Sequence, residues 1–193
     1  MKQTDRDAEQ HPESRMVRKK EFRSREFRGW LISLAIAVAI ALALRLFVFE
    51  FIRVEGESME PTLFTNEFVF MEKVTYRFAE PRRGDIIICL YPGHADTYVK
   101  RVIGVSGDVI AVTDGVLYIN GEANSDYFAD RMNREVRPVT VPEGHVFVMG
   151  DNRNYSMDSR DESIGALPDS MVLGRAVFVI WPLNQIHGLY PPS

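Results

Sequence analysis

The strongest constraint on this chain is a run of apolar residues, Trp30–Leu44, that is interrupted only by Ser33. Past Arg45 the run continues through Leu46–Phe49, which makes about twenty residues, enough for a helix to cross the hydrocarbon core of a bilayer. Arg45 lies near the outer end of the run, where its guanidinium can extend to the lipid headgroups. The sequence therefore predicts one transmembrane helix at residues 29–49.

The 28 residues before this helix are polar and basic. They carry nine Lys and Arg against six Asp and Glu, whereas the rest of the chain carries fourteen against twenty-one. Positively charged flanks stay in the cytoplasm, so we expect residues 1–28 to form a cytoplasmic tail and residues 50–193 to lie outside the cell membrane. A basic flank and an apolar centre also mark a cleavable signal peptide. No convincing small-x-small cleavage site follows the run, which favours a retained single-pass anchor.

From residue 50 onward the sequence has the pattern of β-structure. Short apolar or alternating runs predict strands, and Asp114-Gly115 predicts a hairpin turn between two of them. Residues 127–137 are polar and are predicted to be irregular. We expect a mainly β fold built on an antiparallel sheet, with strands at residues 67–72, 85–90, 98–105, 109–112, 116–119, 146–149 and 172–181.

Composition excludes several classes of function. The charge distribution gives no sign of a basic face, so we expect no nucleic-acid partner. Cys89 is the only cysteine, which excludes an intrachain disulfide. No cluster of His and Cys has the spacing of metal ligands, so we expect neither a metal nor another cofactor.

Ser58 lies in a segment that gives a serine a defined direction. Gly56 permits backbone angles that other residues resist, and Pro61 fixes its own φ. By itself this pattern is more typical of a surface loop between two strands. A serine hydroxyl also needs a base to take its proton before it becomes a strong nucleophile.

Lys100 is the best candidate for that base. None of the four histidines has a recognisable partner motif, whereas Lys100 lies in the apolar β-run Tyr98–Gly104, where a cation is out of place. Alternation puts Lys100 on the same face as Tyr98 and Val102. Burial would lower the lysine pKa and make the neutral amine available as a general base. The alternative is an edge-strand lysine whose ammonium extends to solvent.

A third segment joins an apolar strand, Val146–Met149, directly to the dense polar loop Gly150–Arg160. Loops of this kind, carried on a rigid scaffold, often hold functional residues. A solvated loop with local side-chain turns is the alternative interpretation.

These segments contain four motifs in a fixed order: Ser58-Met59-x-Pro61-Thr62-Leu63; Arg83-Gly84-Asp85; Lys100-Arg101-Val102-Ile103-Gly104 followed by Gly107-Asp108; and Gly150-Asp151-Asn152-Arg153-x-x-Ser156-x-Asp158-Ser159-Arg160. Together they resemble the ordered motifs of bacterial type I signal peptidases, which are membrane-bound endopeptidases with a Ser/Lys dyad. The resemblance extends from the apolar run almost to the C-terminal residues.

The resemblance implies a role for each matching residue. Ser58 would attack the scissile carbonyl, its backbone N–H would donate to the oxyanion, and Lys100 would take the serine proton and later protonate the leaving amine. Ser156 matches the serine that hydrogen-bonds and orients the lysine. The remaining supporting residues of the loop would be Asp151, Arg153, Asp158 and Arg160.

The resemblance also implies where substrate binds. We expect contacts with Val54, Gly56, Met59, Tyr98 and Val99, of which Val54 and Val99 match positions lining shallow pockets for small residues such as alanine, at the first and third positions before the cut. Some family members have a serine two positions before the nucleophile, and its hydroxyl is a second oxyanion donor. This chain has Gly56 at that position, which resembles the Gram-positive form of the family. Water, another backbone N–H or the substrate would then supply that second donor.

The sequence thus predicts an antiparallel β-sheet catalytic domain of signal-peptidase type, with one N-terminal transmembrane helix. The predicted enzyme is a serine endopeptidase that cleaves signal peptides from exported preproteins through an acyl-enzyme, in contact with membrane lipid and near the secretion translocon. Two alternatives remain open. One is a self-cleaving Ser/Lys repressor protease, which would need a DNA-binding region where this chain has a membrane span. The other is a catalytically silent anchored β-domain that binds peptides or a translocation partner.

Overall fold

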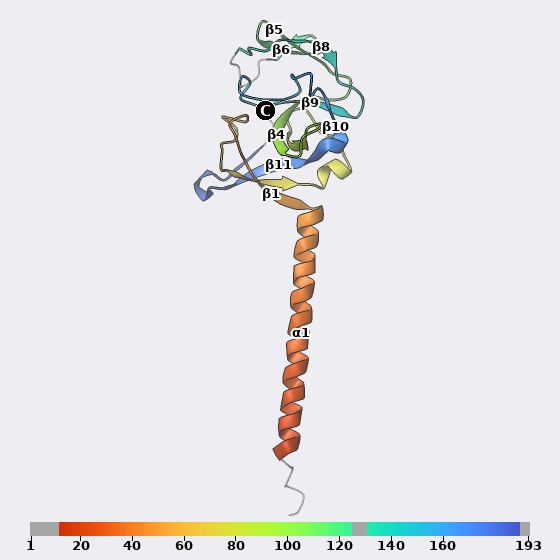
Figure 1. The fold of residues 1–193 in the computed structure, drawn as a ribbon, viewed down its shortest axis with the longest axis vertical. Helices are drawn as coiled ribbons and strands as arrows, with labels where there is room; N and C mark the ends of the chain where they lie inside the picture. The colour runs from red at the N-terminus through yellow and green to blue at the C-terminus, as the bar shows by residue number, and fades with distance from the viewer. Residues whose placement is uncertain (1–11, 125–130, 190–193) are drawn as a thin grey trace, which may run out of the picture. The chain divides into compact units, whose positions relative to one another are not determined.

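A computed structural model of the protein describes residues 12–124 and 131–189, with side chains from residue 27 onward. The chain divides into two compact units, Met1–Arg45 and Leu46–Ser193 (Figure 1). The first unit is helical within its described residues, and the second is built mainly from strands.

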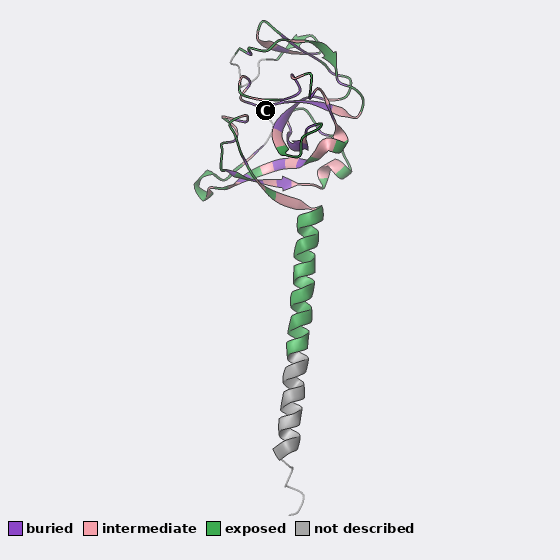
Figure 2. Ribbon diagram, in the orientation of Figure 1, coloured by how far each residue is buried: buried purple, intermediate pink, exposed green. Residues whose placement is uncertain are grey.

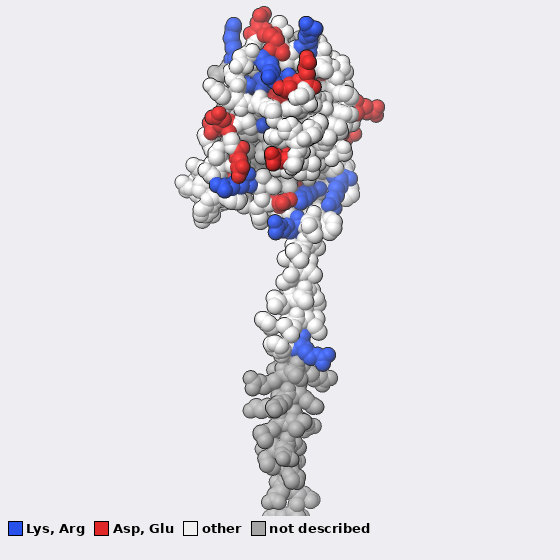
Figure 3. Space-filling view, viewed as in Figure 1, with Lys and Arg blue, Asp and Glu red and all other residues white. Residues whose placement is uncertain are grey.

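Helix α1 spans Pro12–Phe47. Its part from Phe27 to Phe47 has a mean hydropathy of 2.3 and is long and apolar enough to cross a membrane. Side chains of this part are exposed (Figure 2), and in Figure 3 most of them are uncharged. In the sequence, Arg28 and Arg45 lie near the two ends of this part.

The helix differs in extent from the predicted span at residues 29–49. It begins at Pro12, inside the segment expected to be a tail, because Lys, Arg and Glu are good helix formers and proline is accommodated in the first turn. It ends at Phe47, since Phe49 already belongs to the first strand.

The second unit contains two antiparallel sheets, which confirms the predicted fold class. The large sheet has the strand order β1-β2-β11-β3-β4-β9-β10, with β12 paired to β11. Its strands are β1 (Phe49–Arg53), β2 (Phe68–Glu72), β3 (Ile86–Leu90), β4 (Thr97–Gly104), β9 (His145–Met149), β10 (Leu167–Pro168), β11 (Val172–Trp181) and β12 (His187–Gly188).

The small sheet has the order β7-β6-β5-β8, and its β5, β6 and β8 lie together at one end of the unit in Figure 1. Its strands are β5 (Val109–Thr113), β6 (Val116–Ile119), β7 (Glu122–Ala123) and β8 (Val136–Thr140). Three short 3₁₀ helices connect strands of the unit: η1 (Thr75–Arg77), η2 (Asp169–Met171) and η3 (Leu183–Gln185).

All seven predicted strands are present, each within one residue of its predicted ends. The prediction of irregular structure at 127–137 is wrong at its end, because β8 begins at Val136; residues 125–130 lie outside the described chain. This strand includes Pro138 and is the edge of its sheet, and an edge is where a strand tolerates proline.

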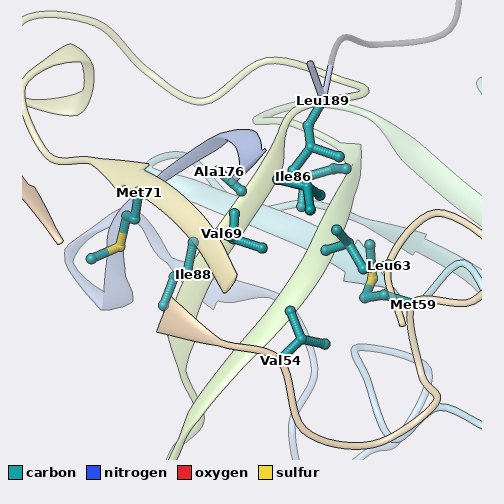
Figure 4. Close-up of a cluster of buried hydrophobic side chains, with 10 residues drawn as sticks. Val54, Met59, Leu63, Val69, Met71, Ile86, Ile88, Ala176 and Leu189 are labelled. Atoms are coloured by element: carbon teal, nitrogen blue, oxygen red, sulfur yellow. The ribbon is translucent and has the colours of Figure 1, made fainter. Parts of the chain in front are cut away.

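Both faces of the large sheet are buried at β3, and alternation along this strand distributes its side chains between them. Ile86 and Ile88 enter one apolar cluster, whereas Ile87 and Cys89 enter another on the opposite face. The first cluster also contains Met59 and Leu63, which come from the segment after β1, as does the nearby Val54 (Figure 4).

Met59 and Leu63 are almost completely buried. Burial of a side chain of this size stabilises a fold by roughly 1.5–3 kcal/mol. The segment that contains Ser58 is therefore fastened to the sheet by the apolar residues that follow the serine.

Candidate active site

Ser58 lies in the turn that follows β1. Val54 is joined to the next strand by hydrogen bonds from its N–H to Glu67 O (2.8 Å) and from Asn66 N–H to Val54 O (2.9 Å). Gly56 then adopts φ +85°, a left-handed conformation that favours glycine. The turn leaves Ser58 half-buried, next to the buried Met59.

Lys100 lies on β4 and is only 2% exposed. Its side-chain Nζ forms a hydrogen bond with Ser58 Oγ over 2.7 Å, although the two residues are 42 positions apart in the chain. Tyr98 and Val102 pack with the cluster that contains Ile87 and Cys89, on the face of β4 that alternation predicts for Lys100.

The environment of Lys100 favours the neutral amine. Burial lowers the pKa of Lys100, and the negative charge of Asp158, the largest opposing influence, does not offset the effect of burial. A buried lysine with a lowered pKa can accept a proton from a neighbouring hydroxyl. The pair can therefore act as nucleophile and general base.

Asp158 and Arg160 form a buried pair in the loop after β9. Arg160 donates from Nε to Asp158 Oδ1 and from Nη2 to Asp158 Oδ2, each over 2.8 Å. Gly150 N–H donates to the same carboxylate over 3.0 Å. Burial by itself would raise the pKa of Asp158, but the hydrogen bonds and charge of Arg160 hold it below its usual value.

A second buried pair joins the start of the same loop to β4. Arg101 Nε and Nη2 donate to the two carboxylate oxygens of Asp151 over 2.8 and 2.7 Å, and Arg101 Nη1 donates to Gly84 O over 2.9 Å. Arg153 is buried in this loop as well.

The sequence reasoning assigned no role to Arg101. One signal could have revealed it, because an arginine within a buried strand requires an acidic partner.

Ser156 lies in the interior of this loop. Its Oγ is buried and has no hydrogen-bond partner within the described part of the chain, so no hydrogen bond to Lys100 is present. The hydroxyl does help to lower the pKa of Asp158, although it forms no hydrogen bond with that carboxylate. Gly150 lies between the two serines, since a Cβ at Gly150 would overlap both Ser156 Oγ and Ser58 O.

A groove of about 480 Å³ opens beside the Ser58–Lys100 pair. Asp96 and the first residues of β4, Thr97–Lys100, form one wall of the groove, and residues 51–55 form another. The first half of β4 pairs only with β3, because β9 joins β4 from Arg101 onward. Among the described residues, one backbone edge of Thr97–Lys100 therefore has no strand partner.

The groove brings together most of the predicted substrate-binding residues. Val54, Met59, Tyr98 and Val99 line it, whereas Gly56 does not. The ring of Tyr98 stacks on Tyr91 with centroids 4.0 Å apart. The sequence reasoning missed Tyr91, whose hydroxyl donates to Met157 O over 2.9 Å and so ties the 150–160 loop to the end of β3.

Among the described residues, no group of three or more His, Cys, Asp or Glu side chains has the arrangement to hold a metal ion.

Comparison with known proteins identifies the class to which this fold and site belong. The family model described as "Signal peptidase, peptidase S26" matches residues 27–181, and the chain belongs to that family. It is accordingly a serine endopeptidase that cleaves signal peptides.

Two relatives from Bacillus agree with this assignment. The chain is 41% identical over 145 residues to "Signal peptidase I" of Bacillus licheniformis, covering 69% of this chain and 77% of the relative. It is 37% identical over 145 residues to "Signal peptidase I T" of Bacillus subtilis (strain 168), covering 69% and 75%. A solved structure of a signal peptidase I from Enterococcus faecalis V583 matches with a TM-score of 0.44 and 31% identity, covering 50% of this chain and 97% of that chain.

We expect Gly150→Ala to lower kcat/KM for a preprotein by about 100-fold or more, because displacements near 1 Å in a catalytic site have effects of that size. The added methyl overlaps Ser58 O and Ser156 Oγ. Cleavage by the purified full chain in detergent measures the effect. Gly29→Ala is the matched control, since nothing lies within 4 Å of a Cβ at Gly29. Similar rates for both variants would show that the 150–160 loop does not support the serine.

Proposed function

We propose that the chain is a membrane-anchored signal peptidase in which Ser58 is the nucleophile and Lys100 the general base. The observation that carries this proposal is the 2.7 Å hydrogen bond between Lys100 Nζ and Ser58 Oγ. Its chemical meaning depends on burial, because an exposed lysine would stay protonated at neutral pH. Lys100 is 2% exposed and its pKa is lowered.

The reaction proceeds through an acyl-enzyme. The neutral Lys100 amine takes the Ser58 proton as the serine oxygen attacks the scissile carbonyl carbon. The carbonyl oxygen becomes an oxyanion that accepts a hydrogen bond from the Ser58 backbone N–H. As the peptide bond breaks, Lys100 gives its proton to the leaving amine, which is the N-terminus of the mature protein. A water molecule, activated by Lys100, then hydrolyses the ester.

The 150–160 loop supports this dyad. We assign Ser156 the role of orienting the Lys100 amine, since its hydroxyl is buried, has no partner within the described chain and lies beside Gly150 close to the Ser58 backbone. The pairs Asp158–Arg160 and Arg101–Asp151 hold the loop in position.

The groove beside Ser58 accepts the signal peptide as an extended strand. The unpaired edge of Thr97–Lys100 offers backbone groups for β-augmentation. Val54 and Val99 both line the groove, and we assign them the shallow pockets for small residues at the first and third positions before the cut. This arrangement supports cleavage after Ala-x-Ala sequences.

Ser58→Ala and Lys100→Met are each expected to abolish cleavage of a purified preprotein, because the first removes the nucleophile and the second removes the base. Mass spectrometry of the wild-type products should place the cut after a small-x-small sequence. Lys73→Met is the matched control, since Lys73 forms a partly exposed ion pair with Glu50. Full turnover by Ser58→Ala would exclude the proposed nucleophile and favour a peptide-binding domain without this chemistry.

The pH dependence follows from the protonation state of Lys100. Only the neutral amine is a base, so kcat/KM should rise with pH as Lys100 loses its proton, with a midpoint below the ordinary lysine pKa of 10.5. Asp158→Asn removes a negative charge that raises the Lys100 pKa, and should move the midpoint to lower pH.

Asp161→Asn in the same loop is the control for this pH profile, because Asp161 pairs with Arg134 at a partly exposed position. A wild-type midpoint at or above 10.5, or an upward shift in Asp158→Asn, would show that Lys100 does not govern the profile.

We also propose a single-pass topology. The basic residues before the apolar stretch favour a cytoplasmic segment at 1–28 and an extracytoplasmic catalytic domain at 50–193. The span predicted at 29–49 corresponds to the apolar part of α1 that ends at Phe47. This anchor would hold the site near lipid and the secretion translocon, where signal peptides emerge, and so raise the effective concentration of substrate.

Protease added to intact cells should digest the region beyond residue 50 and spare an epitope tag attached at the N-terminus. The reverse result is expected with inverted membrane vesicles, and a cytoplasmic marker protein serves as the control for intact membranes. Protection of the catalytic domain in intact cells would reverse the proposed topology.

A further inference from the structure

Asn152 binds two consecutive carbonyl groups of the serine segment. Its side-chain Nδ2 donates to Glu57 O over 3.1 Å, and its backbone N–H donates to Ser58 O over 3.0 Å. Asn152 thus contacts the peptide groups on both sides of the Ser58 Cα, although it lies 95 positions after Glu57 in the chain.

These two contacts determine the direction of a backbone N–H. In a trans peptide the C=O and the N–H point in opposite directions, so the Ser58 N–H points away from Asn152 when Glu57 O points toward it. Glu57 O also accepts from Glu60 N–H over 3.1 Å, which holds the same peptide plane from a second side. The Ser58 N–H has no acceptor within the described chain, and it remains free to donate.

The residue two positions before the serine makes this direction more important. Gly56 has no side-chain donor, and no atom lies within 4 Å of where its Cβ would be. No side chain at this position can donate to the oxyanion, so the Ser58 N–H becomes more important, and the direction of that N–H is set by the orientation of its peptide plane. Gly150 also packs closely on the Ser58 carbonyl, because any Cβ at this position would overlap Ser58 O.

We propose that Asn152 is a positioning residue that aligns the Glu57–Ser58 peptide, so that the Ser58 N–H donates to the oxyanion. Asn152 does not touch the reacting atoms itself. The inference rests on the proposed function, since it requires Ser58 to be the nucleophile. It assigns the side-chain amide of the loop a part in transition-state stabilisation rather than in substrate binding.

Asn152→Asp tests the side-chain amide at nearly constant size, because a carboxylate oxygen replaces the donor and faces Glu57 O. Asn152→Ala removes the same donor without adding a charge. Both variants should lose kcat by roughly 10- to 100-fold, less than the 10²–10³ that follows complete removal of an oxyanion donor, while KM stays within about twofold. Asn154→Ala is the matched control, since Asn154 bonds Arg131 O and Asn133 N–H instead of the serine segment.

A second measurement separates alignment of the oxyanion donor from a general structural role. With an alanine-ended peptide aldehyde, Ser58 Oγ adds to the aldehyde carbon, its proton passes to Lys100, and the former carbonyl oxygen occupies the oxyanion position. Both Asn152 variants should lose affinity for the aldehyde by about the factor lost in kcat. Affinity for the corresponding peptide alcohol, which forms no adduct, should stay unchanged.

The outcomes are distinguishable. Equal losses for the aldehyde and the alcohol, an effect on KM alone, or wild-type kcat in both variants would overturn the role of Asn152. If Ser58→Ala retains activity in the same assay, the proposed function fails instead. Thermal unfolding of each full-length variant in detergent identifies a folding defect, and a kcat loss found only in a variant that is unfolded at the assay temperature would also count against the proposal.

Discussion

The hydrogen bond between Lys100 Nζ and Ser58 Oγ is the interaction on which the rest of the site depends. It requires a lysine to be buried, and burial of an ammonium is unfavourable unless the group is paired or becomes neutral. The fold meets this requirement with β4, whose pairing with β3 carries Lys100 inward, and with the apolar anchors Met59 and Leu63, which hold the serine segment against the sheet. The lowered pKa of Lys100 is thus a consequence of the same packing that brings the two residues together.

The 150–160 loop is held at both ends by buried ion pairs, Arg101–Asp151 and Arg160–Asp158. Buried pairs of this kind contribute little net stability, since desolvation offsets most of their attraction. Their bidentate geometry instead restricts where the loop can lie. In this position the loop packs Gly150 against both Ser58 O and Ser156 Oγ. We therefore interpret the two ion pairs as interactions that fix the position of the loop. This role explains why so many charged residues are buried around one short loop.

Local patterns were sufficient for the strands and for the two residues of the dyad. Alternation along β4 identified a lysine on a buried face, and the ordered motifs connected it to Ser58. Contacts between distant segments were not accessible in the same way. An asparagine in a polar loop is typical of a local turn, so nothing nearby in the sequence indicates that Asn152 reaches Glu57. The predicted bond from Ser156 to Lys100 came from resemblance alone, and the described chain does not contain it. Strand β8 was not predicted from the sequence, because it contains Pro138 and begins within the polar segment 127–137.

Gly56 connects the backbone of the serine segment to the chemistry of the oxyanion. A serine at this position would supply a side-chain donor, but at φ +85° a residue with a Cβ is strained by roughly 1–2 kcal/mol. The left-handed turn thus disfavours a side-chain donor at this position, and the Ser58 backbone N–H, which has no acceptor within the described chain, becomes more important. Such donors are effective only when their peptide planes are fixed, because they cannot reorient independently of the chain. Because Gly56 offers no side-chain donor, the orientation of the peptide planes at Ser58 has to be accurate. Gly150 and Asn152, which pack on the Ser58 carbonyl, hold that orientation.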